Sequence, residues 1–213
     1  MYILISKAPA TALSFQSSQH MPPPEVNHPG LEACRPLVES MLDNNEGFGP
    51  AEPDDLMMIG TFLHTYTFME LNLHRAVRLF RKAGSLSERE SRRPAASDLP
   101  QLVLKGSASL SLSASDQSTL KDCLHQIELR QPFRNLLAHW ALRRLPGTDI
   151  LVFVTMDERD AKLIGGDPPE YNDLFYALAF GADLRGLSLH ISPYGVWLAE
   201  HVSGWQQELF PKV

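Results

Sequence analysis

The clearest pattern in the chain is a stripe of apolar residues over 55–83, which predicts a long amphipathic helix. Asp54 or Asp55 can cap its N-terminus, and Gly84 follows as a stop signal. Three basic residues fall in the last turns, where cations interact favourably with the helix dipole: Arg78, Arg81 and Lys82. The apolar residues recur at spacings of three and four, which places them on one helix face: Ile59, Phe62, Leu63, Tyr66, Met69, Leu73, Val77 and Phe80.

Shorter periodic stretches predict further helices over 31–43, 116–130, 132–142, 171–182 and 193–209. Proline interrupts a helix but is well tolerated at its first position. We therefore expect Pro132 to break the chain, with Gln131 capping a new helix. Arg134 then lies in the first turn of that helix, and Pro193 opens the last one.

Turn residues at 146–148 separate 141–145 from the Val-, Ile- and Phe-rich stretch 149–156, which is typical of a β-hairpin. The Ser- and Arg-rich stretch 85–115 predicts a flexible insertion, with one short helical turn near 98–105.

The N-terminal residues 1–53 are rich in Pro, Gly and Ser, which predicts a weakly structured extension with Met21 as an alternative start. The remainder, 54–213, forms one domain. We predict a mainly α fold, an antiparallel helical bundle with a small β-hairpin insertion.

Composition fits a globular protein, with 44% hydrophobic and 21% charged residues among 213. Cys34 and Cys123 are too few for a disulfide framework and lack zinc-site spacing. No apolar run reaches the roughly 20 residues that a membrane-spanning helix needs. The apolar start lacks a basic leader, so a cytoplasmic location without membrane, metal or cofactor is the expectation.

Charge is unevenly distributed along the chain, whose net charge is −6. Residues 75–144 hold 13 of the 19 basic and 6 of the 25 acidic residues, a net charge of +7. A basic middle suits contact with a phosphate backbone. A solvated helix face with an Arg-rich loop is the alternative interpretation.

One short segment carries residues suited to phosphate chemistry, Arg134-Asn135-Leu136-Leu137-Ala138-His139. A guanidinium binds phosphate oxygens through paired hydrogen bonds, and an imidazole exchanges protons near neutrality. On a helix, five residues turn the chain by about 500°, so Arg134 and His139 lie about 140° apart. Asn135 and His139 share a face, so Asn135 can orient the imidazole.

Glu70 lies on or beside the apolar stripe of the first long helix. A carboxylate on that stripe needs a partner or must be neutral. The candidate partners are Arg134, His139 and Arg130. The alternative is that Glu70 lies at the edge of the stripe and reaches solvent.

A long helix with an inward Glu70, a second helix and the segment around Arg134, Asn135 and His139 resemble the HEPN superfamily of helical-bundle proteins. The resemblance covers about 56–142 and, more loosely, the later helices. It implies metal-independent RNA cleavage by a homodimer whose two motifs face each other across a cleft, in proteins that often act as toxins or defence nucleases.

In the roles that the resemblance implies, Arg134 holds the scissile phosphate and His139 transfers protons as a 2′-hydroxyl attacks. Asn135 orients the phosphate or the imidazole, and Glu70 positions the pair. Further RNA contacts are expected from Arg130, Arg143 and Arg144, and an antitoxin-like protein is a possible partner.

Two other functions fit the same sequence. In a non-catalytic dimerisation or regulatory module, Arg134, His139 and Glu70 are structural. In a small-molecule sensor, aromatic side chains line a pocket: Tyr194, Trp197 and Trp205. Trp140 departs from the family, because relatives often have a small residue at this position, and its bulk bears on how open the cleft is.

Overall fold

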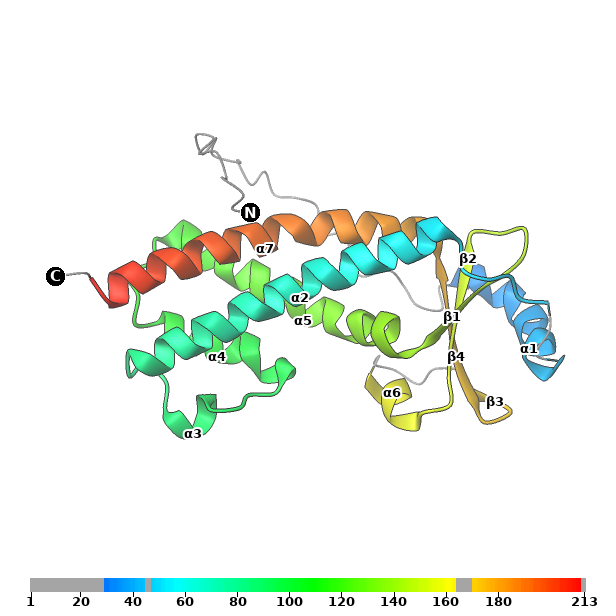
Figure 1. Cartoon of the computed structure of the whole chain (residues 1–213), viewed down its shortest axis with the longest axis horizontal. Helices are drawn as coiled ribbons and strands as arrows, with labels where there is room; N and C mark the ends of the chain where they lie inside the picture. The colour runs from blue at the N-terminus through cyan, green and yellow to red at the C-terminus, as the bar shows by residue number, and fades with distance from the viewer. Residues whose placement is uncertain (1–28, 45–46, 164–169, 212–213) are drawn as a thin grey trace, which may run out of the picture.

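Three long helices lie side by side, with a small β-sheet across one end (Figure 1). They are α2 (Pro53–Lys82), α5 (Ala114–His139) and α7 (Gly181–Leu209). A computed structural model describes residues 29–44, 47–163 and 170–211. Helix α5 runs antiparallel to α2, whereas α7 runs parallel to it, so the bundle is only partly antiparallel.

Helix α2 begins and ends close to the predicted limits of 55–83. Pro53 occupies its first turn, and a carboxylate oxygen of Asp55 accepts a hydrogen bond from the backbone N–H of Glu52 at 2.9 Å. The helix ends at Lys82, and Gly84 adopts a positive φ of 77° in the turn that follows. The prediction of this helix is confirmed.

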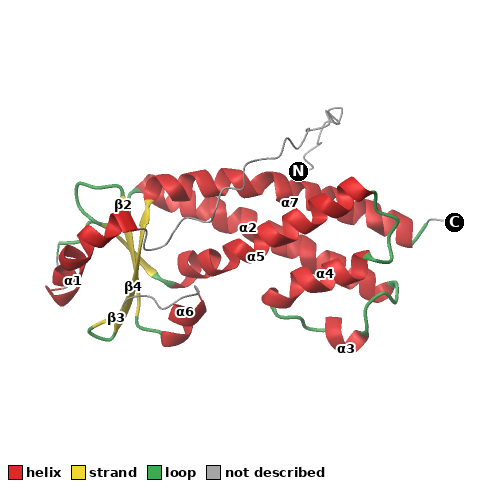
Figure 2. Cartoon of the chain, turned by 180° about the vertical axis from the view of Figure 1, so that it is seen from behind, coloured by secondary structure: helices red, strands yellow, loops and turns green. Residues whose placement is uncertain are grey.

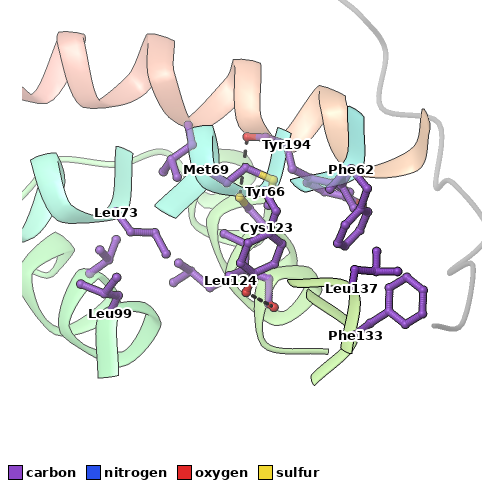
Figure 3. Packing of buried hydrophobic residues seen from close by; sticks show 14 of the residues in the cluster. Phe62, Tyr66, Met69, Leu73, Leu99, Cys123, Leu124, Phe133, Leu137 and Tyr194 are labelled. Carbon is purple, nitrogen blue, oxygen red and sulfur yellow. Dashed lines mark hydrogen bonds between the residues drawn. The ribbon is translucent and has the colours of Figure 1, made fainter. Parts of the chain in front are cut away.

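The main core forms where α2 meets α5 and α7 (Figure 3). Phe62 of α2 packs edge to face on Phe133 of α5, with ring centroids 5.5 Å apart. Further along α2, the ring of Phe80 lies 5.7 Å from that of Trp205 in α7. These contacts bury the predicted stripe at its opposite ends and hold the three helices in register.

Both prolines that were expected to break helices lie inside them. Pro132 lies within the continuous helix α5, and Pro193 lies within α7, which starts 12 residues earlier than predicted, at Gly181. An internal proline removes one helical hydrogen bond and costs about 3 kcal/mol. Burial of neighbouring residues offsets this cost, because Phe133 beside Pro132 and both Ile191 and Tyr194 beside Pro193 lie in the core.

The sheet has four antiparallel strands in the order β1-β2-β4-β3. Strands β1 (Ala141–Arg144) and β2 (Ile150–Thr155) form the predicted hairpin, in which Arg144 pairs with Leu151. The remaining strands are β3 (Glu170–Tyr171) and β4 (Leu174–Phe180).

The helix predicted over 171–182 is therefore wrong. Asn172 and Asp173 both have positive φ, 50° and 62°, which suits a two-residue hairpin turn between β3 and β4. Strand β4 is buried on both faces, so its sequence is continuously apolar and carries no alternation that would distinguish strand from helix.

The N-terminal elements cover the outer face of the sheet (Figure 2). They are a 3-10 helix η1 (Pro29–Cys34) and helix α1 (Arg35–Asn44). Leu31 and Val38 pack with Val152 and Leu178 in a second, smaller core. Part of the predicted weakly structured extension 1–53 is thus packed into the domain, whereas 1–28 lies outside the described residues.

The stretch predicted as an insertion with one helical turn contains more regular structure. It forms α3 (Glu88–Ser91), the 3-10 helix η2 (Ala96–Asp98) and α4 (Leu99–Ser107). Leu99 and Val103 are buried in the main core. A further short helix, α6 (Glu158–Leu163), packs near the end of α5.

Two small features complete the fold. Gly49 pairs with Arg144 through two backbone hydrogen bonds of 2.9 and 3.0 Å, which extends the sheet beyond β1. Gly106 lets α4 approach α2, because a Cβ atom there would lie 2.4 Å from the ring of Phe80. Within the described residues, no helix combines the length and apolar character needed to span a membrane.

We predict that Gly106→Ala lowers the free energy of unfolding by about 1–3 kcal/mol, because its methyl group overlaps the buried ring of Phe80. Gly60→Ala is the matched control, since a Cβ atom at this exposed position of α2 meets no atom within 4 Å. It should stabilise the protein by about 1 kcal/mol through helix propensity. Urea denaturation of both variants checks this; equal effects would contradict the packing of α4 on α2.

Candidate active site

The centre of the candidate site is an ion pair between α2 and α5. A guanidinium nitrogen of Arg134 lies 3.8 Å from a carboxylate oxygen of Glu70. The side chains are 30% and 16% exposed, so the pair lies at the surface of the bundle without being fully solvated. Glu70 thus has one of the three partners expected from the sequence.

Asn135 continues this arrangement on α5. Its side-chain oxygen accepts a hydrogen bond from Arg134 Nη1 at 3.3 Å. The bonds described for Arg134 use few of the five N–H donors of a guanidinium. The remaining donors and the partial exposure of the side chain leave Arg134 able to bind an anion.

His139 is the last residue of α5, and its side chain is exposed. Five residues of helix separate it from Arg134 by a rise of about 7.5 Å and a rotation of about 140°. The structure therefore does not bring the two side chains together within one copy. Trp140 follows, but its ring is 6% exposed and lies in the main core, so it does not cover His139.

The prediction that Arg134 lies in the first turn of a helix is wrong. Because α5 is continuous through Pro132, Arg134 lies about one and a half turns before its C-terminal end. Free backbone N–H groups occur only in the first turn of a helix. Anion binding by Arg134 must therefore come from its guanidinium alone.

Beneath the ion pair lies a buried polar group that the sequence analysis did not single out. The hydroxyl of Tyr66 donates to the backbone carbonyl of Ile127 at 3.1 Å, which joins α2 to α5. Burial, and then the nearby carboxylate of Glu70, raise the pKa of Tyr66 well above its ordinary value. The available signal was its position four residues before Glu70 on the same stripe.

Arg130, expected to contact RNA, is fully buried. Its guanidinium donates to the backbone carbonyl of Gln126 at 3.2 Å and to the side-chain oxygen of the same residue. Burial lowers the pKa of Arg130 from its ordinary value. A buried arginine cannot reach a phosphate backbone, so Arg130 is a structural residue.

Arg144, also expected to contact RNA, is held by carboxylates. Its guanidinium lies 2.9 Å from Asp55, 3.4 Å from Glu52 and 3.4 Å from Asp149. Asp55 is 1% exposed, so this cluster joins the start of α2 to the β1–β2 hairpin. Of the three expected additional contacts, only Arg143 is an exposed cation.

The aromatic residues considered for a small-molecule pocket have other roles. Tyr194 and Trp205 are buried in the main core. Trp197 stacks on His201 with ring centroids 3.8 Å apart. Among the described residues, no group of three His, Cys, Asp or Glu side chains is placed to hold a metal ion.

The Arg144 cluster generates a stability prediction. Arg144→Ala leaves the buried carboxylate of Asp55 without its ion-pair partner and should lower the free energy of unfolding by about 3–5 kcal/mol. Arg143→Ala, at the exposed neighbouring position, should change it by less than about 0.5 kcal/mol. Thermal and chemical denaturation compare the two, and a loss of similar size in both variants would show that the cluster is not structural.

Comparisons with protein families, characterised proteins and solved structures found no significant match to this chain. The assignment of a function therefore rests on the residues and on their arrangement.

Proposed function

We propose that the chain is a HEPN-like, metal-independent endoribonuclease that acts as a dimer. The observation that carries the proposal is the ion pair between Glu70 of α2 and Arg134 of α5 at the surface of the bundle, with the exposed His139 on the same helix as Arg134. An arginine held by a carboxylate can neutralise a phosphate, and an accessible imidazole can transfer protons, and both functions serve phosphate-ester cleavage.

Arg134 binds the scissile phosphate in this proposal. Glu70 holds one side of the guanidinium, and Asn135 fixes another donor through their 3.3 Å hydrogen bond. The remaining donors can form paired hydrogen bonds to two phosphate oxygens. Charge neutralisation of this kind stabilises the phosphorane-like transition state more than the ground state.

His139 transfers protons. As base, an imidazole removes the proton of the 2′-hydroxyl while its oxygen attacks phosphorus. The bond from phosphorus to the 5′-oxygen breaks, and a protonated imidazole supplies the proton that this oxygen needs. The products are a 2′,3′-cyclic phosphate and a 5′-hydroxyl, with no metal ion and no net change in protons.

A second copy of the chain supplies what one copy lacks. Attack and departure occur on opposite sides of phosphorus, so a base and an acid are both needed. One copy has a single His139, and its Arg134 lies on another part of the surface of α5. One copy therefore cannot supply both the base and the acid. Two copies related by a twofold axis bring two Arg134 and two His139 side chains to one shared cleft.

The second candidate function, a non-catalytic helical module, is supported by the structural use of other polar groups. Arg130 and Arg144 are both engaged inside the fold. In that function, Glu70 and Arg134 stabilise the contact between α2 and α5, and His139 is an unused surface residue. The following experiment separates the two.

We expect the purified chain to cleave single-stranded RNA in the presence of EDTA and to leave 2′,3′-cyclic phosphate ends. His139→Ala should reduce the rate by about 10²- to 10⁴-fold, the usual contribution of general acid–base catalysis. Arg134→Lys should also reduce it strongly, because an ammonium cannot form the paired hydrogen bonds of a guanidinium. Gel analysis of end-labelled RNA measures these rates.

His125→Ala is the matched control, because His125 is also an exposed histidine on α5, 14 residues before His139. It should retain full activity. Equal cleavage by wild type and His139→Ala, or no cleavage by either, would reject the nuclease and favour the module. Sedimentation as a monomer at all concentrations that support cleavage would reject the shared cleft.

A further inference from the structure

A hollow with a basic rim lies between the C-terminal halves of α2 and α7. Its volume is about 340 Å³, at the lower end of the range for ligand-binding pockets. In Figure 1 these helix ends lie at the end of the bundle away from the sheet. The lining residues come from both helices: Arg75, Arg78, Leu79 and Lys82 of α2, and Val202, Gln206 and Phe210 at α7.

Three cations line one side of this hollow. Arg75, Arg78 and Lys82 are exposed and follow one another at spacings of three and four, so they share a face of α2. Within the described residues, none of them has an ion-pair partner; Arg75 donates to the side-chain oxygen of Asn72 at 2.7 Å. Like charges at this spacing repel each other, which a bound anion would relieve.

The helix dipole explains the position of only one of these three cations. A cation in the last turn interacts favourably with the C-terminal end of a helix, and Lys82 occupies that turn. The effect is lost beyond the last turn. Arg78, which the sequence placed in the last turns, lies four residues before the observed end, and Arg75 lies seven residues before it. Both are outside the last turn, so the helix terminus does not explain their positions.

The rest of the hollow is suited to a flat, apolar group. Leu79 and Val202 are buried residues at its base. Phe210 is 42% exposed, so its ring is accessible to a flat group. A second hollow, of about 520 Å³, shares Phe210 and Gln206 with the first and adds Ser203 and Gln207. The two hollows therefore adjoin each other across Phe210.

We propose that these two hollows bind consecutive nucleotides of single-stranded RNA. Arg75, Arg78 and Lys82 hold the phosphates, and Phe210 stacks on a base. The amide and hydroxyl groups of the second hollow can bond to base edges. Single strands combine an anionic backbone with accessible bases, and their binding proteins combine cations with exposed aromatic side chains in this way. A duplex hides its base faces, and a free mononucleotide would fill only one hollow.

This surface is separate from the candidate active site. Arg75 follows Glu70 by five residues, which corresponds to a rise of about 7.5 Å and a rotation of about 140° around α2. The surface therefore contributes RNA affinity and not the chemical step. The inference rests on the proposed function for its choice of RNA as ligand, but binding can be measured where cleavage is removed.

The test measures binding of a short fluorescent single-stranded RNA to the full chain carrying His139→Ala, so that the RNA stays intact. Adding Arg78→Gln and Lys82→Gln should weaken binding about tenfold. It should also reduce the slope of log affinity against log salt concentration by about 1.4, the value for two lost phosphate contacts on a single strand. Arg75 is kept because it bonds to the buried Asn72.

Arg92→Gln with Arg93→Gln is the matched control in the same background. Arg92 and Arg93 are exposed and follow α3, which lies apart from α7 (Figure 1). Their substitution removes two positive charges from the basic stretch 75–144, as Arg78→Gln with Lys82→Gln does. Binding should be unchanged. Phe210→Ala, which removes no charge, should weaken binding about tenfold without altering the salt slope. Circular dichroism confirms that each variant is folded.

The outcomes separate this inference from the proposed function. Binding that depends on Arg78 and Lys82 in a chain that never cleaves RNA would support the inference and reject the nuclease. Cleavage by the wild type, with equal binding by the Arg78/Lys82 and Arg92/Arg93 variants, would reject only the inference. Competition by uridine monophosphate or by RNA duplex as strong as that of the single strand would also overturn it.

Discussion

The burial of α2 against three other helices is the constraint on which the rest of the structure depends. This helix packs against α4, α5 and α7, and its buried residues form one broad stripe along its length. A shift of α2 would disturb the packing of Phe62 on Phe133 and that of Phe80 on Trp205 at the same time. Glu70 is held in place by this packing, so the geometry of the candidate site follows from the core beside it.

Local sequence patterns predicted the elements whose apolar residues face one side, and failed where tertiary burial overrides a local signal. The long helix α2 and the β1–β2 hairpin carried clear periodicity or turn residues. Pro132 and Pro193 indicated breaks, but the core on either side of each proline keeps α5 and α7 continuous. Strand β4 lacked any periodicity because both of its faces are covered.

The candidate site shows the same division between what local sequence patterns predict and what tertiary contacts decide. The need of a stripe carboxylate for a partner limited the candidates to Arg134, His139 and Arg130, and the structure places Arg134 beside Glu70. Sequence could not separate Arg130 and Arg144 from solvent-exposed arginines, because the partner of Arg144 lies 89 residues away at Asp55. The spacing of Arg75, Arg78 and Lys82 was visible in the sequence, but the opposite wall of their hollow comes from α7, more than 100 residues later.

The backbone pairing of Gly49 with Arg144 has a consequence for assembly. An open sheet edge offers unpaired backbone groups to which another chain can add a strand. In the described part of the chain, Gly49 occupies the outer edge of β1 near its end, and the opposite edge is the two-residue strand β3. Each of these contacts pairs with only part of its neighbouring strand, so it shortens, without closing, the edge available for β-pairing between copies. In the dimer proposed above, the two copies would meet through helical surfaces, where the side chains of α5 are available to both.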